Sequence, residues 1–324
     1  MKDIGGYFGF ELKNGNEFHS KVVRLNSGRN CLDYFLEIEN VKEIFISHYS
    51  CPELIEKINN RNIKIHFYKI DENFEILNLD EYIDVKCFFM YTNYFGLKNS
   101  YVLFLSKFFQ NNILIIDNAQ SFFSSHLDNI ATFYSPRKFF GVPDGGYLYY
   151  NKNKRVIKAD NSLQSFKHLL LGADKQVNKG YNYYKKNEEL IKNKPTLGMS
   201  EITRKILKSI DYKKIKNARR KNFQVFHESL EPINKIKLNI EWNDVPYFYP
   251  LMVYRQGLRQ HLIKNRIYVP KLWPKLNHLK IENKYEYNFV NYIIPLPIDH
   301  RIYKRDCLKI IKVIIEFLKN DKKK

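Results

Sequence analysis

The chain has 324 residues and a formal net charge of +20, with 44% apolar and 27% charged residues. This length and composition predict a globular protein with a substantial core, built as two domains or as one large domain with an appendage. No apolar run approaches the roughly 18 residues of a membrane-spanning helix, and the first residues are too weakly apolar for a secretory signal. We therefore expect a cytoplasmic protein without a membrane span.

Basic residues are spread along the whole sequence, with dense runs only at residues 213–221 and in the tail 319–324. We interpret the first run as a solvated helix face and expect no nucleic-acid binding, although a positive field would attract an anionic nucleotide sugar. The four cysteines have no paired spacing, and the histidines show no ligand spacing. This pattern argues against both a disulfide framework and a metal site.

The first third of the chain alternates between predicted strands and helices. Ser-Gly-Arg-Asn at residues 27–30 precedes an apolar segment with helical spacing, which indicates either a plain N-cap or a helix start that could hold a phosphate. Residues 41–47 form a predicted strand. Tyr49 follows the end of this strand and belongs either to a ligand site or to the core. The next predicted segments are a helix at 53–60, an outer strand at 62–70, a strand at 85–91 and a helix at 101–109. This alternation predicts a mostly parallel sheet.

The stretch from residue 113 to residue 150 is the most informative part of the sequence. Four aliphatic residues at 113–116 predict a buried strand that ends in Asp117. A second short strand at 130–134 is followed by Ser-Pro-Arg-Lys, ending in Lys138. Two adjacent strand ends would then present an acid and a lysine to one cleft, as pyridoxal phosphate (PLP) chemistry requires. Taken alone, the same residues also fit a strand-end cap and a surface lysine.

Four motifs in this order resemble the DegT/DnrJ/StrS family of PLP-dependent sugar aminotransferases. Residues 117–120 (Asp-Asn-Ala-Gln) resemble the family's Asp-Ala-Ala-Gln, and Pro136–Lys138 resembles its Pro-x-Lys. The Gly-Gly pair at 145–146 stands at the family's offset from the lysine. Residues 180–184 (Gly-Tyr-Asn-Tyr-Tyr) resemble its Gly-Tyr-Asn-Tyr-Arg. The resemblance implies an α/β, fold-type I aminotransferase with a mostly parallel central sheet flanked by helices and a smaller C-terminal α+β domain.

The resemblance also implies roles for individual residues. Lys138 would form the Schiff base with PLP and move the proton during the reaction, while Asp117 would face the pyridine nitrogen. Gln120 would hydrogen-bond the phenolic oxygen of the cofactor. Tyr49 is our candidate for the aromatic residue that stacks on its ring.

The phosphate of the cofactor would be held by Gly28, Arg29, Ser135 and Asn182. In the family the asparagine reaches the neighbouring subunit's PLP phosphate, so Asn182 implies a homodimer with shared active sites. Two positions depart from the family pattern, because Arg29 replaces a threonine and Tyr184 replaces an arginine.

The second half of the chain predicts a smaller domain. We expect a surface loop at 151–161, a helix at 163–171, and a loop at 180–184 ahead of a charged helix at 185–192. A long amphipathic helix within 197–226 would lead into the smaller domain. Short elements then follow at 235–240, 247–254, 256–264, 268–273 and 291–296, with a final helix at 303–318. The predicted domains are residues 1–200, which bind PLP, and residues 201–324.

The function implied by the resemblance is transfer of an amino group, with glutamate as the donor, to a nucleotide-linked keto sugar. Such reactions serve cell-surface polysaccharide synthesis, including that of lipopolysaccharide. Two alternatives remain open from the residues themselves. One is a PLP enzyme with a different outcome, such as a decarboxylase or an aldol-type lyase. The other is a protein that keeps the fold without turnover, or a basic binding module.

Overall fold

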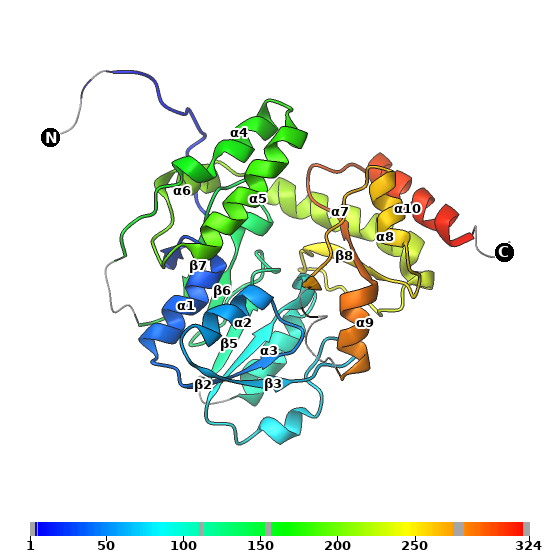
Figure 1. The fold of residues 1–324 in the computed structure, drawn as a ribbon, viewed down its shortest axis with the longest axis horizontal. Helices are drawn as coiled ribbons and strands as arrows, with labels where there is room; N and C mark the ends of the chain where they lie inside the picture. Colours follow the sequence, from blue (N-terminus) through cyan, green and yellow to red (C-terminus); the bar gives the residue numbers. More distant parts are fainter. Residues whose placement is uncertain are drawn as a thin grey trace.

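The computed structural model describes residues 4, 6–109, 113–152, 157–274, 276 and 282–319. A seven-stranded sheet with helices on both faces forms the larger unit, and a two-stranded sheet with helices forms the smaller one (Figure 1). The predicted α/β class with a mostly parallel central sheet is confirmed. In the described residues, no helix has the length and apolarity needed to cross a membrane.

The large sheet has the strand order β1-β7-β6-β5-β4-β2-β3. Strands β2 to β6 run parallel, whereas β7 and β1 are antiparallel to their neighbours. The predicted outer strand is β3, at one edge. Strand β1 was not predicted, because three residues are too few for a periodic pattern. The strands are β1 Val23–Leu25, β2 Glu43–Ser47, β3 Lys64–Tyr68, β4 Phe88–Thr92, β5 Leu114–Asn118, β6 Ala131–Tyr134 and β7 Gly146–Tyr149.

Alternating side chains place each face of this sheet in a different core. On β5, Ile115 packs with α1 (Gly28–Ile38) and α2 (Pro52–Asn59), while Leu114 and Ile116 point to the opposite face. That opposite face is covered by α3 (Asn99–Phe108) and by α9 (Lys284–Tyr292), which comes from the second half of the chain. Strands buried on both faces read as continuous apolar runs, which is the pattern that the sequence shows at 113–116.

The predicted loop at 180–184 is wrong, because these residues lie inside α5 (Val177–Asn193). This helix packs on α4 (Lys167–Ala173), beside it in Figure 1. A side chain at Gly180 would lie 3.3 Å from the backbone oxygen of His168, so the glycine permits the close approach of the two helices. The motif therefore serves helix packing here rather than a loop.

The single long helix predicted within 197–226 is two helices, α6 (Glu201–Lys208) and α7 (Tyr212–Leu230). The chain breaks between them because Asp211 caps α7, its Oδ1 accepting the backbone N–H of Lys214 at 3.0 Å. Helix α7 then runs from the large unit to the small one (Figure 1).

The smaller unit is built on β8 (Phe248–Met252), which pairs antiparallel with β9 (Ile293–Pro297). Helices α7, α8 (Leu258–Lys264) and α10 (Lys304–Lys319) enclose its core. The short elements predicted at 235–240 and 268–273 form neither a helix nor a strand. Helix α9 was missed, because its sequence is rich in tyrosine and other residues that favour strands.

The predicted domain boundary at residue 200 stays a prediction. Part of the predicted loop at 151–161 and most of the basic tail lie outside the described residues.

Candidate active site

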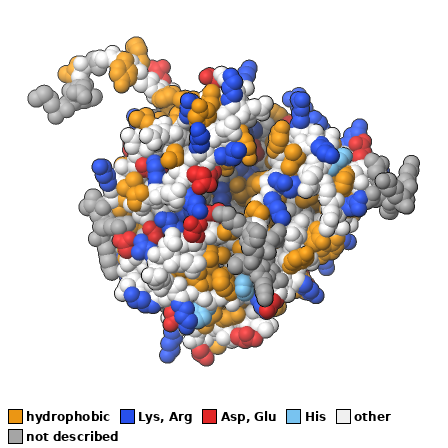
Figure 2. All heavy atoms as spheres, in the orientation of Figure 1, with side chains coloured by type: hydrophobic (Ala, Val, Ile, Leu, Met, Phe, Trp, Pro, Cys, Tyr) orange, Lys and Arg blue, Asp and Glu red, His pale blue; other side chains and the backbone are white. Residues whose placement is uncertain are grey.

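A cavity of about 830 Å³ lies at the carboxyl ends of the parallel strands, where the large unit meets the small one. Its lining comes from the ends of β5 and β6, from the starts of α1 and α2, from α4, α5 and α7, and from the chain after β9. On the side of the molecule that Figure 2 shows, charged side chains of both signs lie together near the middle. Ligands of open α/β sheets bind at such strand ends.

Lys138 and Asp117 both line this cavity. The sheet register places Asp117 near the end of β5, between Thr92 of β4 and Phe133 of β6. Lys138 ends a short turn, Pro136–Lys138, directly after β6, and its Nζ lies 5.9 Å from the ring centroid of Tyr247. The structure thus brings the acid and the lysine to one cleft.

The carboxyl group of Asp117 is almost fully buried, with 3% of the residue exposed. Burial raises its pKa. The charge of Lys138, the N–H of Ala119 at 2.8 Å from Oδ1 and the hydroxyl of Thr92 act in the opposite direction without cancelling that effect. The raised pKa means that burial disfavours the ionised carboxylate. A cationic group placed against Asp117 would stabilise the carboxylate and be stabilised by it.

The first turn of α1 lies at one corner of the cavity and has the features of a helix start that could hold an anion. Ser27 caps the helix, its Oγ accepting the N–H of Asn30 at 3.1 Å, and the first amides of a helix have no partner within it. A Cβ at Gly28 would lie only 3.4 Å from the Cβ of Ser135, so these two segments meet closely. Arg29 also lines the cavity and forms no ion pair with any described residue.

Three predicted site residues do not line the cavity. Gln120 is buried, and its Oε1 accepts the backbone N–H of Phe95 at 2.9 Å. Tyr49 lies in the core, its ring 4.6 Å from that of Trp273. Asn182 is exposed on α5. Gln120 and Tyr49 were predicted to contact a cofactor ring, which requires side chains that line this cavity. Neither side chain is part of its lining.

Sequence reasoning missed the lining contributed by the smaller unit, above all Arg219 on α7. Its Nη1 donates to the backbone oxygens of Tyr247 at 2.9 Å and Pro246 at 3.3 Å, and its guanidinium lies 4.5 Å over the ring of Phe139. Burial lowers the pKa of Arg219 to about 10. A signal existed in the sequence, because Arg219 falls on the apolar stripe of α7, four residues before the buried Phe223.

Two further arginines of the cavity wall are paired with acids. Arg137 forms an ion pair with Glu188. Arg301 binds Asp299 through two hydrogen bonds of 2.7 and 3.0 Å. These pairs leave the cavity with charges that are largely balanced.

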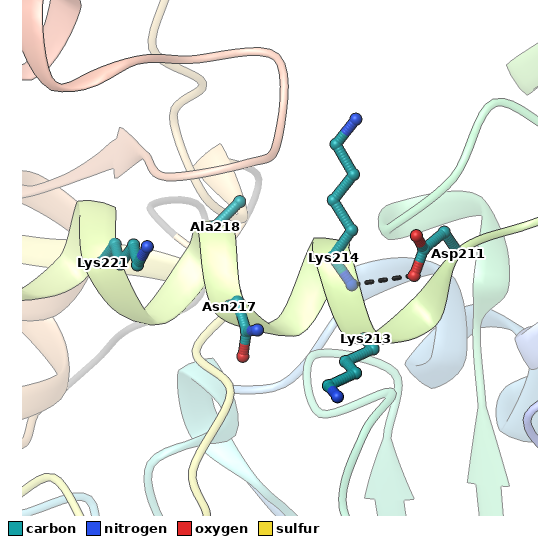
Figure 3. A pocket seen from close by; sticks show the side chains of 6 residues that line it. All are labelled: Asp211, Lys213, Lys214, Asn217, Ala218 and Lys221. Atoms are coloured by element: carbon teal, nitrogen blue, oxygen red, sulfur yellow. Dashed lines mark hydrogen bonds between the residues drawn. The ribbon is translucent and has the colours of Figure 1, made fainter.

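A second, more open hollow of about 500 Å³ lies along the outside of α7 (Figure 3). Lys213 and Lys214 point to opposite sides of the helix there, and Lys221 lies two turns further on. These side chains do not converge on one point, as expected for a solvated helix face. Arg219 belongs to the same basic run but is buried, so the prediction of a solvated face is wrong for that residue.

In the described part of the chain no group of His, Cys, Asp and Glu could hold a metal ion.

The sequence matches no protein-family profile and no curated protein. Solved structures do share its fold. A DegT/DnrJ/EryC1/StrS aminotransferase from Brucella abortus is 16% identical, covers 92% of this chain and 86% of its own, and gives a TM-score of 0.64. DesV from S. venezuelae is 14% identical over 91% of this chain and 84% of its own, with a TM-score of 0.66.

Spr1654 from Streptococcus pneumoniae, described as a sugar aminotransferase, is 14% identical over 94% of this chain and 88% of its own. Its TM-score is 0.66. Structures of Spr1654 in its PLP and pyridoxamine phosphate (PMP) forms match as well. The chain therefore has the fold of these aminotransferases.

Proposed function

We propose that the protein is a PLP-dependent aminotransferase that moves an amino group from glutamate to a nucleotide-linked keto sugar. The observation that carries this proposal is the meeting of Lys138 and Asp117 in one cavity at the carboxyl ends of adjacent strands. The comparison structures support it, because they share the fold and include PLP and PMP forms of a sugar aminotransferase.

The described residues fit PLP. Lys138 would bind its carbonyl carbon, and Asp117, with its burial-raised pKa, would be held ionised by the protonated ring nitrogen. Gly28 and Arg29 begin the first turn of α1, Ser135 lies close beside Gly28, and this corner would take the phosphate. When bound, PLP supplies an electron sink for the carbanion formed at the donor's α-carbon.

Lys138 would also act as base and acid. Its amine would take the proton from the α-carbon of glutamate and later donate one to the sugar carbon that receives the amino group. Tyr247 keeps its ring against the Lys138 ammonium, and the backbone N–H of Tyr247 is fixed by the oxygen of Phe95 at 2.8 Å. Gln120 holds the N–H of the same Phe95, so we assign it a positioning role through Tyr247.

The test is the visible absorption of lysine-bound PLP together with turnover. We expect Lys138→Ala to abolish that band and to lower turnover by at least 10²- to 10⁴-fold, the usual worth of a positioned acid–base group. Lys213→Ala, on the outer face of α7, is the matched control and should keep both. A Lys138→Ala protein that transaminates at the wild-type rate would end the proposal. Product analysis with glutamate and keto sugars separates transamination from decarboxylation or aldol cleavage, and absence of PLP binding would favour a protein without turnover.

We further propose that two copies of the chain share their active sites. Helix α5 turns Asn187 inward, its Nδ2 donating to the oxygen of Pro143 at 3.1 Å, while Asn182 is exposed on another side. Two apolar residues of the same helix are also exposed, Tyr181 next to Asn182 at 58% and Leu190 about two turns further along at 40%. A second copy packed on this surface would receive Asn182 at its phosphate corner.

A cytoplasmic location and a role in cell-surface polysaccharide synthesis complete the proposal. All four cysteines are free thiols, as is usual in a reducing compartment. Nucleotide sugars, the proposed acceptors, are the precursors from which such polysaccharides are built.

A further inference from the structure

The junction between α9 and the large sheet contains a buried carboxyl group, that of Glu286. Helix α9 comes directly before β9 of the smaller unit, yet its Phe289 and Val290 join the core on one face of the large sheet (Figure 1). Glu286 lies about one turn earlier on the same helix and is 1% exposed. A carboxyl group buried between two units is costly to keep ionised, so its surroundings decide its charge.

Only one of the two carboxyl oxygens accepts a hydrogen bond within the described part of the chain. Oε1 of Glu286 accepts the backbone N–H of Ile70 at 3.2 Å, whereas Oε2 is buried and has no partner. Asn283, which caps α9, donates its Nδ2 to the backbone oxygen of Ile70 at 2.8 Å. Both backbone polar groups of Ile70 therefore bind the start of α9, and this contact joins the chain after β3 to the helix.

The large sheet presents an imidazole and two phenol groups to this carboxyl. At the end of β2, Nδ1 of His48 lies 4.0 Å from Oε2, and burial lowers the pKa of this imidazole, which favours its neutral form. The phenol groups of Tyr68 and Tyr94 also feel the charge of the carboxyl. Their hydroxyls donate elsewhere, to the backbone oxygens of Met90 at 2.8 Å and Tyr49 at 2.9 Å. Neither phenol therefore has a proton left for Oε2.

The surroundings of Glu286 favour its neutral form. Burial raises the pKa of Glu286 to about 7. The N–H of Ile70, the charge of Lys69 and the hydroxyl of Ser47 act in the opposite direction without cancelling that effect. Lys69 is exposed, and its Nζ lies 3.6 Å from the carboxylate of Glu282, which compensates part of its charge. The carboxyl group of Glu286 is therefore mostly protonated in the closed junction below neutral pH.

We propose that Glu286 makes the junction of α9 with the large sheet a proton-operated joint, which closes when the carboxyl is protonated and loosens when it is ionised. The ionised group leaves a charge buried without a cation hydrogen-bonded to it, and opening the joint returns that charge to water. The smaller unit also carries Phe248 and Arg301 of the cavity wall, so the joint sets how firmly that wall is held. It works in the same way for any ligand of the cavity.

The direction of the pH dependence follows from the two protonation states. Between the ordinary glutamate pKa of 4.5 and about 7, the closed joint holds a proton that the open joint releases. The equilibrium constant for opening should therefore rise with pH in this window, by up to about tenfold per unit, and level off above about pH 7. His48 acts in the opposite direction, because opening lets its neutral imidazole take up a proton below its ordinary pKa of 6.5. A comparison of variants that all keep His48 removes this contribution.

The first experiment measures hydrogen exchange in α9 and in residues 68–74 from about pH 5 to about pH 8, with labelling times scaled for the intrinsic rate. The opening constant of the wild type, divided by that of Glu286→Gln, should rise by about tenfold or more up to about pH 7 and then stay level. Glutamine keeps an acceptor for Ile70 but cannot ionise. Glu282→Gln is the matched control, because Glu282 lies beside the same end of α9 but is exposed, and it should follow the wild type.

Two outcomes of this experiment would overturn the proposal. One is a ratio of opening constants that does not change with pH. The other is equal protection of α9 and β5, because the joint would then open only when the whole sheet unfolds.

A second measurement does not depend on the folding of a variant. Carboxyl-carbon NMR of wild-type protein labelled in its glutamates should show a resonance that titrates near pH 7, well above the ordinary glutamate value of 4.5. Glu286→Gln should remove this resonance, and Glu282→Gln should keep it. If every glutamate carboxyl of the wild type titrates below about pH 5.5, the inference is wrong.

Discussion

His19 is a neutral imidazole held in an aromatic pocket beside the large sheet. Its Nε2 lies 2.8 Å from the backbone oxygen of Phe122 and its Nδ1 lies 3.2 Å from the hydroxyl of Tyr149. Its ring centroid is 4.1 Å from that of Tyr134. Burial lowers the pKa of His19 to about 3, because a charged imidazolium would lose its hydration.

This shift predicts a pH dependence of stability. Between the unfolded pKa of about 6.5 and the folded value of about 3, the unfolded chain binds a proton that the folded protein does not. The contribution of His19 to the free energy of unfolding is therefore fully present above about pH 6.5. It is lost as the pH drops below that value, at a rate of at most about 1.4 kcal/mol per pH unit. Urea unfolding at several pH values should show a shallower slope for His19→Phe than for the wild type. An unchanged slope would mean that His19 does not titrate as its burial requires.

The site residues differ in how far the sequence could predict them. Lys138 and Asp117 were predictable, because both follow short apolar strands that are adjacent in the chain and in the sheet. Tyr49 was not, because its core position depends on Trp273, more than 200 residues away. Arg219 was hidden in a basic run, and only its position on the apolar stripe of α7 distinguished it.

At the scale of elements, Gly146 sets the distance between β7 and the start of α1. A Cβ at this position would lie 2.4 Å from the backbone oxygen of Ser27 and 2.7 Å from Cys31 Sγ. Gly145, with a φ of +125°, makes the turn that brings the strand there and packs on Pro136. The Gly-Gly pair therefore fixes the first turn of α1 beside the lysine segment.

Gly146→Ala should destabilise the protein by about 1 to 3 kcal/mol or more, because the contact is with backbone that cannot move aside without shifting α1. The measurement is the urea midpoint. Gly172→Ala in α4 is the control, since no atom lies within 4 Å of its added methyl group, and it should be neutral or stabilising by up to about 1 kcal/mol. Equal effects of the two substitutions would contradict the close approach.

Two of the elements that were missed or predicted wrongly owe their structure to packing against other elements. Helix α9 has the composition of a strand but covers the large sheet, where Phe289 and Val290 join its core. The motif at 180–184 was expected to be a loop, and contact with α4 makes it helical. The strands of the large sheet were predictable, because their apolar runs reflect burial on both faces.

At the scale of the whole molecule, shared active sites predict complementation between two inactive variants. Lys138→Ala and Asn182→Ala remove residues that would belong to the same site but to different copies. A mixed dimer would contain one site with both substitutions and one intact site, so random mixing should restore about a quarter of wild-type activity.

The variants would be mixed under conditions that exchange subunits, and turnover and molar mass would be measured together. As a control, each variant alone is taken through the same subunit-exchange procedure. Its turnover should stay low. Failure of the mixture to regain activity, although it forms mixed dimers, would place Asn182 in the site of its own chain.

The cavity takes its walls from Ser27 near one end of the described chain and from Arg301 near the other. During synthesis the strands of the large sheet emerge first, and α9, which covers part of one face of the sheet, emerges much later. The pocket itself has no opposite wall until the ribosome has made the segment after β9. A nascent chain that has not reached residue 301 therefore has the strands of the sheet but no complete place for a ligand, so a ligand of this cavity can bind only after that residue has been made.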